Sequence, residues 1–148
     1  AGGIGVMCAT DLIISMVDTK FCLTETKIGL TPAQIAPYVI NKVGFQQAKK
    51  LMLLAETFSG QKAYDIGMVD YICHNKKELN TYVNHVIEQV QFCSPNAIAV
   101  TKRLLNANLN TNIGNASKLF SESALHEEGR EGLSSFFQKR KPFWKIKE

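Results

Sequence analysis

The chain has 148 residues, 45% of them hydrophobic, which is enough to bury one core and matches the length of a single domain. The formal net charge of +4 is mild, and no repeat or low-complexity tract divides the chain. The basic surplus lies near the C-terminus (Lys139, Arg140, Lys141, Lys145 and Lys147), which predicts a local anion site and argues against a nucleic-acid-binding surface.

The first sixteen residues are apolar, but they lack a basic start, are interrupted by Asp11 and are too short to span a bilayer. We therefore predict neither a signal sequence nor a membrane segment. The histidines lack any ligand spacing, so no metal site is predicted. The cysteines are widely spaced in apolar segments and predict reduced, buried thiols of a cytoplasmic protein, or of the mitochondrial matrix in a eukaryote. They are Cys8, Cys22, Cys73 and Cys93.

The opening of the chain predicts a tight glycine turn over residues 1–5, a short buried helix and a strand over residues 12–16. Glycines at a helix start let backbone N–H groups face an anion or a polarised carbonyl, helped by the positive end of the helix dipole. Close backbone packing is the more frequent cause of such a turn.

Residues 21–24 are strand-like and lead to Glu25, which has apolar neighbours on both sides. A carboxyl group on an apolar surface loses hydration, which favours its protonated form and lets it exchange a proton near neutral pH. A solvent-facing strand residue is the alternative interpretation of this window. Thr31 as the cap and Pro32 as the first residue predict a helix that ends at Gly44.

The rest of the chain is largely helical in pattern. A short capped helix is expected within residues 58–67 and a strand over 68–73. Further helices are expected over 45–55, 76–91, 94–105, 116–125 and 133–139. Residues 106–115 are expected to form a loop or a helix start, and residues 127–132 to separate the last two helices.

Several separated motifs occur in one order. They are the Gly-Gly turn, F-x-x-x-E-x-x-x-G-x-x-P over residues 21–32, A-Y-D-I-G-M-V over 63–69, Ser94-Pro95, E-G-R-E-G over 128–132 and K-R-K-P over 139–142. The whole chain resembles the C-terminal part of the crotonase, or enoyl-CoA hydratase/isomerase, superfamily. Residues 21–40 look most like the branch that hydrates methylglutaconyl-type substrates.

The resemblance implies an α/β fold with two parts. Residues 1–75 would be the end of the ββα spiral core, and residues 76–148 a helical region that mediates trimer formation and contacts CoA. The partners would be an acyl-CoA substrate and identical subunits, as a homotrimer or a dimer of trimers. No cofactor is implied, because CoA is part of the substrate.

The resemblance also implies site residues. In the family, two backbone N–H groups stabilise the thioester enolate. Gly2 would supply one, with Gly3 beside it, and the other would lie upstream of Ala1. An aromatic matching Phe120 and a lysine matching Lys139 reach the adenine and phosphate of CoA.

The chain departs from the family at one position. Hydratases generally use two glutamates, of which Glu25 matches one, while Gly5 stands where the other is expected. Hydration of an enoyl-CoA is the favoured prediction. A double-bond isomerase with Glu25 as its single base, and a non-catalytic acyl-CoA binding module, are the alternatives.

Overall fold

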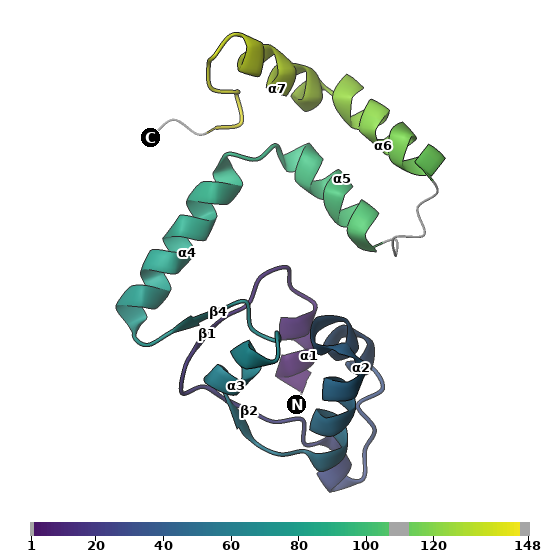
Figure 1. Ribbon diagram of the computed structural model, residues 1–148, viewed down its shortest axis with the longest axis vertical. Coiled ribbons are helices and arrows are strands. Elements are labelled where there is room, and N and C mark those ends of the chain that lie inside the picture. Colours follow the sequence, from purple (N-terminus) through teal and green to yellow (C-terminus); the bar gives the residue numbers. More distant parts are fainter. Residues whose placement is uncertain (1, 107–112, 146–148) are drawn as a thin grey trace. The chain divides into compact units, whose positions relative to one another are not determined.

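The computed structural model describes residues 2–106 and 113–145 (Figure 1). Residues 1–82 and 83–148 form two compact units. The predicted division at residues 75 and 76 stays a prediction. Helix α4 (Lys76–Gln91) has the predicted bounds, and the boundary between the two units falls within it.

The first unit contains short strands and helices. They are α1 (Gly2–Cys8), β1 (Ile14–Met16), β2 (Lys20–Phe21), the 3₁₀ helix η1 (Glu25–Ile28), α2 (Ala36–Leu54), β3 (Phe58–Ser59), α3 (Gly60–Asp65) and β4 (Tyr71–Cys73). Strands β1 and β4 pair in parallel, with Ser15 opposite Ile72. Strands β2 and β3 pair antiparallel, and the rings of Phe21 and Phe58 stack at 5.6 Å between centroids.

The core of the first unit is apolar and closely packed, and α1 lies against α2 (Figure 1). Its most deeply buried large side chains are Leu23, Met68, Val39, Val69 and Cys73. Asp70 joins two elements at the edge of this core, because its Oδ2 atom accepts a hydrogen bond from Ile13 N at 2.7 Å and pairs with Lys42 Nζ at 3.3 Å.

Three predictions near the site are wrong. The glycines do not form a turn before a helix: Gly2, Gly3 and Gly5 all lie within α1. Thr31 and Pro32 do not open α2, which begins at Ala36 after a turn closed by hydrogen bonds from Ile35 N and Ala36 N to Pro32 O. The strand expected over residues 21–24 ends at Phe21.

The predicted helix break at Gly44 is confirmed. Within α2 this glycine has a φ of 75° and a ψ of 162°, a conformation that is costly for any residue with a Cβ atom. The turn of the backbone there separates the two apolar segments that the sequence pattern distinguishes.

The second unit contains three helices that contact one another: α5 (Pro95–Asn106), α6 (Ile113–Leu125) and α7 (Glu127–Phe137). The Glu128 carboxylate joins α7 to the start of α5 by accepting hydrogen bonds from Ser94 Oγ at 2.5 Å and Asn96 N at 2.8 Å. These bonds hold the pKa of Glu128 below its usual value.

The prediction that residues 127–132 separate two helices is wrong, because they form the first turns of α7. His126 caps this helix by accepting a hydrogen bond from Glu128 N at 3.3 Å. A Cβ atom on Gly132 would lie 3.3 Å from the Trp144 ring. Glycine at this position of α7 therefore lets the Trp144 ring lie close to the helix backbone.

Candidate active site

Glu25 is the first residue of η1, which is fastened to the end of α2. Thr26 Oγ1 donates a hydrogen bond to Met52 O at 3.0 Å, and Cys22 Sγ lies 3.2 Å from Ala55 O. Leu23, which is 1% exposed, packs into the core and holds the segment in place. Glu25 is therefore held by the packing of a short helix, and it does not project from a strand as the sequence pattern suggested.

The Glu25 side chain is half-buried, and its carboxylate is incompletely satisfied. Among the side chains of residues 2–106 and 117–145, its Oε2 atom is the one buried oxygen or nitrogen without a hydrogen-bond partner. Leaving a buried polar atom unpaired costs about 1–3 kcal/mol. A buried polar group without a partner needs an explanation, and a catalytic role is one such explanation.

A pocket of about 380 Å³ lies beside this carboxylate, and it is formed by three segments. These are the start of α1, η1 and the turn that leads into α2. The lining residues are Gly2, Glu25, Thr31, Pro32, Ala33, Gln34 and Ile35. The structure thus brings the predicted residues Gly2 and Glu25 to one pocket.

The backbone at the start of α1 is open. A Cβ atom on Gly2 or on Gly3 would meet no other group within 4 Å, and both residues are exposed. The first N–H groups of a helix have no partner inside the helix. A carbonyl oxygen in the pocket can therefore approach the backbone of Gly2 without steric hindrance.

Gly5 is buried under Ile35. A Cβ atom on Gly5 would lie 2.7 Å from Ile35 Cβ and nearer still to its Cγ2 atom, whereas non-bonded carbons keep about 3.5–4.0 Å apart. The space in which the resemblance expects a second glutamate is thus taken by an isoleucine. Glu25 is the one acidic residue among those that line the pocket.

Phe120 and Lys139 belong to the second unit, whereas Gly2 and Glu25 belong to the first. Phe120, on α6, is 76% exposed. Lys139 follows the end of α7 and is also exposed; its φ of 53° is in the left-handed region, and its N–H bonds to Phe136 O at 3.2 Å. Both side chains are open to solvent.

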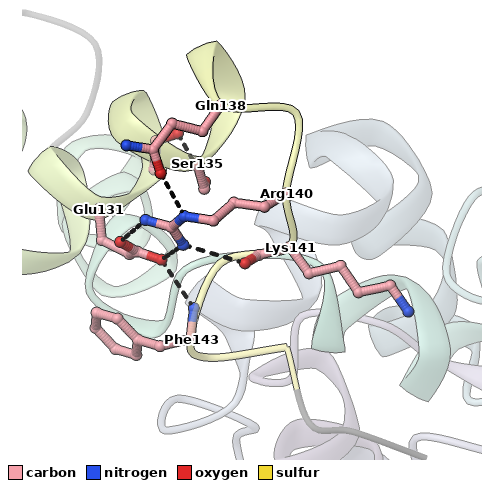
Figure 2. Close-up of polar contacts among 7 residues, drawn as sticks. Glu131, Ser135, Gln138, Arg140, Lys141 and Phe143 are labelled. Carbon is pink, nitrogen blue, oxygen red and sulfur yellow. Dashed lines mark hydrogen bonds and ion pairs between the residues drawn. The ribbon is translucent and has the colours of Figure 1, made fainter.

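The basic cluster after α7 has an internal partner, which the sequence pattern did not predict. Figure 2 shows the Arg140 guanidinium between the Glu131 carboxylate, the Gln138 side chain and the Lys141 carbonyl, with Arg140 Nη2 2.7 Å from Glu131 Oε2. Glu131 also accepts a hydrogen bond from Phe143 N at 3.1 Å.

The bond from Arg140 holds the pKa of Glu131 below its usual value. The charge of Arg140 is therefore committed to this ion pair. Lys139, Arg140 and Lys141 are all exposed, and Arg140 is the one of the three that pairs with Glu131.

A second cavity, of about 360 Å³, lies between the end of α2 and β3. It is lined by Lys50, Leu51, Leu54, Phe58 and Lys62, among others, and it contains none of the predicted site residues. Over the part of the chain that the structure describes, no three acidic, histidine or cysteine side chains are grouped as a metal site would need. No helix in the same residues has the length and apolar character to cross a membrane.

Comparison with known proteins identifies the family. The sequence profile of the family described as enoyl-CoA hydratase/isomerase matches residues 1–147. The chain belongs to this family. The predicted membership of the crotonase superfamily is thereby confirmed, while the closeness to methylglutaconyl-type hydratases stays a prediction.

Among curated relatives, the 2,3-dehydroadipyl-CoA hydratase of Escherichia coli is 28% identical over 140 residues, which cover 91% of this chain and 54% of the relative. In these curated relatives, the chain spans between 27% and 58% of the relative's own length.

Solved structures confirm the fold prediction. Pseudomonas aeruginosa AtuE is 39% identical with a TM-score of 0.92, over 98% of this chain and 58% of that one. An enoyl-CoA hydratase/isomerase from Marinobacter aquaeolei is 35% identical with the same TM-score, over 98% of this chain and 56% of that one. The chain is therefore an α/β protein with the crotonase fold.

Proposed function

We propose that this chain carries the proton-transfer half of an enoyl-CoA hydratase site, which adds water reversibly to an α,β-unsaturated acyl-CoA. One observation carries the proposal: the Glu25 carboxylate, with its unpartnered Oε2 atom, lines the same pocket as the backbone of Gly2. Membership of the enoyl-CoA hydratase/isomerase family supports it.

Gly2 has the role of an oxyanion donor in this proposal. Its N–H, at the start of α1, would bind the thioester oxygen, on which negative charge develops as the enolate forms. The second donor that the family uses is not assigned to a residue of this chain. Gly3 would leave room beside the thioester, because its backbone is open on the same turn.

Glu25 has the role of the proton carrier. As the oxygen of water bonds to the β-carbon, Glu25 would take a proton from that water, and the electrons of the double bond would move toward the thioester. Glu25 would then return a proton to the α-carbon, and the carboxylate would be regenerated. Positioned general acid–base catalysis of this kind contributes about 10²–10⁴-fold in rate.

Phe120 and Lys139 have the role of CoA contacts. An exposed aromatic ring can stack on adenine, and a lysine supplies a mobile point charge for a phosphate. In the proposed assembly, a homotrimer or a dimer of trimers, these residues would serve a pocket in another subunit. The ion pair between Glu131 and Arg140 supports the segment that follows Lys139 (Figure 2).

The proposed substrate has an apolar acyl group with a methyl branch. The apolar side chains of Pro32, Ala33 and Ile35 in the pocket lining support an apolar substrate. Residues 21–40, which resemble the methylglutaconyl branch, support the methyl branch.

A specific observation favours a second candidate. Because Ile35 fills the space beside Gly5, the pocket offers one carboxylate, and one carboxylate suffices to move a proton between two carbons. A Δ3,Δ2-enoyl-CoA isomerase with Glu25 as its base is therefore the alternative function.

Product analysis distinguishes the two functions. We expect the full-length protein that contains these residues to convert a 2-enoyl-CoA into a 3-hydroxyacyl-CoA. Chromatography and mass spectrometry detect the product. If it forms no 3-hydroxyacyl-CoA but shifts a 3-enoyl substrate to the 2-enoyl form, the hydratase proposal is wrong and the isomerase assignment replaces it.

A further inference from the structure

Ile35 has a fixed position at the rim of the pocket. It is the N-cap residue of α2, its N–H donates to Pro32 O at 3.1 Å, and its carbonyl accepts from Val39 N at 3.1 Å. The side chain is half-buried and packs against the core of the first unit. The hydrogen bonds therefore fix the backbone of Ile35, and its side chain contacts the core.

The side chain of Ile35 faces Gly5 on one side and lines the pocket. Gly5 lets it lie against α1, because any Cβ atom at position 5 would overlap Ile35. Ile35 thus forms part of the pocket wall and also contacts helix α1 at Gly5. A larger residue at position 5 would displace Ile35 from its seat.

We propose that Ile35, seated on Gly5, is a specificity-determining residue that sets the room for substituents on the acyl carbons beside Glu25. The inference rests on the proposed function. Glu25 has to reach the α- and β-carbons of the acyl group, so another wall of the same pocket meets the groups attached to them. Ile35 is the largest apolar side chain in that lining.

Two substitutions move this wall in opposite directions. Ile35→Ala shortens the side chain and widens the pocket, which favours an acyl group with a methyl branch at the β-carbon. Gly5→Ala forces Ile35 away from α1 and narrows the pocket, which disfavours the branch. One methyl group in an apolar pocket changes binding or selectivity by about 10–200-fold.

The test uses two saturated thioesters, butyryl-CoA and 3-methylbutyryl-CoA, which carry no double bond and cannot be hydrated. Calorimetry gives the ratio of their dissociation constants for the wild-type protein and each variant. We expect Ile35→Ala to shift the ratio about tenfold toward the branched thioester, Ile35→Val to shift it less, and Gly5→Ala to shift it the other way. Ile66→Ala is the matched control, because Ile66 is half-buried in the same unit and lies outside the pocket lining.

An unchanged ratio in Ile35 variants that still bind butyryl-CoA as tightly as the wild type overturns the inference. An equal shift in Ile66→Ala, or failure of the wild-type protein to bind either thioester, overturns it too. General loss of stability would weaken both ligands alike and leave their ratio unchanged. Turnover of crotonyl-CoA is measured separately. A shifted ratio without turnover refutes the proposed hydratase and upholds the role of Ile35, whereas turnover with an unchanged ratio does the reverse.

Discussion

At the scale of single residues, the carboxylate of Glu25 lowers the stability of the folded state. Its Oε2 atom is buried without a partner, in a segment otherwise tied down by Thr26 and Leu23. Residues that serve a site commonly lower stability, because the arrangement that binds a reacting group is not the one that packs best.

Glu25→Leu should therefore keep or raise the melting temperature while abolishing turnover. Leucine has a similar size and replaces a poorly paired oxygen by apolar atoms, a change that can be neutral or stabilising. Glu88→Leu, at an exposed position of α4, is the control and should give no gain. A Glu25→Leu protein that unfolds well below the wild type would show that Glu25 has a structural role.

The cysteines differ more than the sequence predicts. Only Cys8 and Cys73 are buried, so the prediction of burial is wrong for Cys22, which is half-buried, and for Cys93, which is exposed. Burial raises the pKa of the Cys8 and Cys73 thiols. The thiolate is the reactive form.

A thiol reagent should consequently modify Cys93 first and reach Cys8 and Cys73 only on unfolding. Mass spectrometry of the labelled protein over time measures the order. Cys93→Ser should remove the fastest step. Equal rates at Cys73 and Cys93 in the native protein would contradict the packing of β4.

At the scale of secondary-structure elements, η1 depends on the core beneath it. Leu23 is 1% exposed and lies two residues before the start of the helix that carries Glu25. Leu23→Ala should lower the free energy of unfolding by about 2–5 kcal/mol, because it leaves a cavity in a packed core. Leu53→Ala, at a position that is 64% exposed, should cost much less in the same denaturant titration.

Two carboxylates make the second unit sensitive to acid. Hydrogen bonds from Ser94 and Asn96 lower the pKa of Glu128, and the bond from Arg140 lowers that of Glu131. A carboxyl whose pKa is lower in the folded state stabilises the protein above its unfolded pKa. That contribution is lost as the pH falls through the folded pKa.

Glu131→Gln should thus lower the melting temperature at neutral pH and flatten its decline below the usual glutamate pKa of about 4.5. Thermal melts between neutral and acid pH measure this. Glu88→Gln is the control and should follow the wild-type curve. A Glu131→Gln curve parallel to the wild type throughout would exclude the ion pair with Arg140 as the cause.

Local patterns predict some elements well and fail at others for identifiable reasons. Helix α4 carries a continuous apolar stripe and has the predicted bounds. Residues 127–132 contain two glycines and four charged residues, typical of a loop, yet they are helical because Glu128 bonds to the start of α5 and Gly132 lies against Trp144. These contacts join distant parts of the chain, and no local pattern encodes them.

The same distinction applies to the candidate site. The order of motifs predicts Glu25 and the glycines of α1, and the structure places Gly2 and Glu25 at one pocket. The packing of Ile35 over Gly5 was not predictable, because a sequence does not reveal which side chain fills the space above a helical glycine. Ile35 lines the pocket, whereas Ala36, Pro37 and Tyr38 are not among its lining residues.

At the scale of the whole molecule, the proposed chemistry is divided between two units. The pocket with Gly2 and Glu25 lies in residues 1–82, and the proposed CoA contacts Phe120 and Lys139 lie in residues 83–148. The chain spans about half the length of the curated relatives it matches, so the assays belong on the longest protein that contains these residues. The proposed function depends on proton transfer by Glu25.

The most direct measurement is the hydration rate of crotonyl-CoA by the wild-type protein and by Glu25→Gln, together with the affinity of each for butyryl-CoA. Glutamine keeps the size and polarity of the side chain but cannot take up and return a proton. We predict that turnover falls about 10²-fold or more while the affinity stays within a factor of a few. Unchanged turnover in Glu25→Gln would contradict the assignment, and binding without turnover in the wild type would instead indicate a non-catalytic acyl-CoA module.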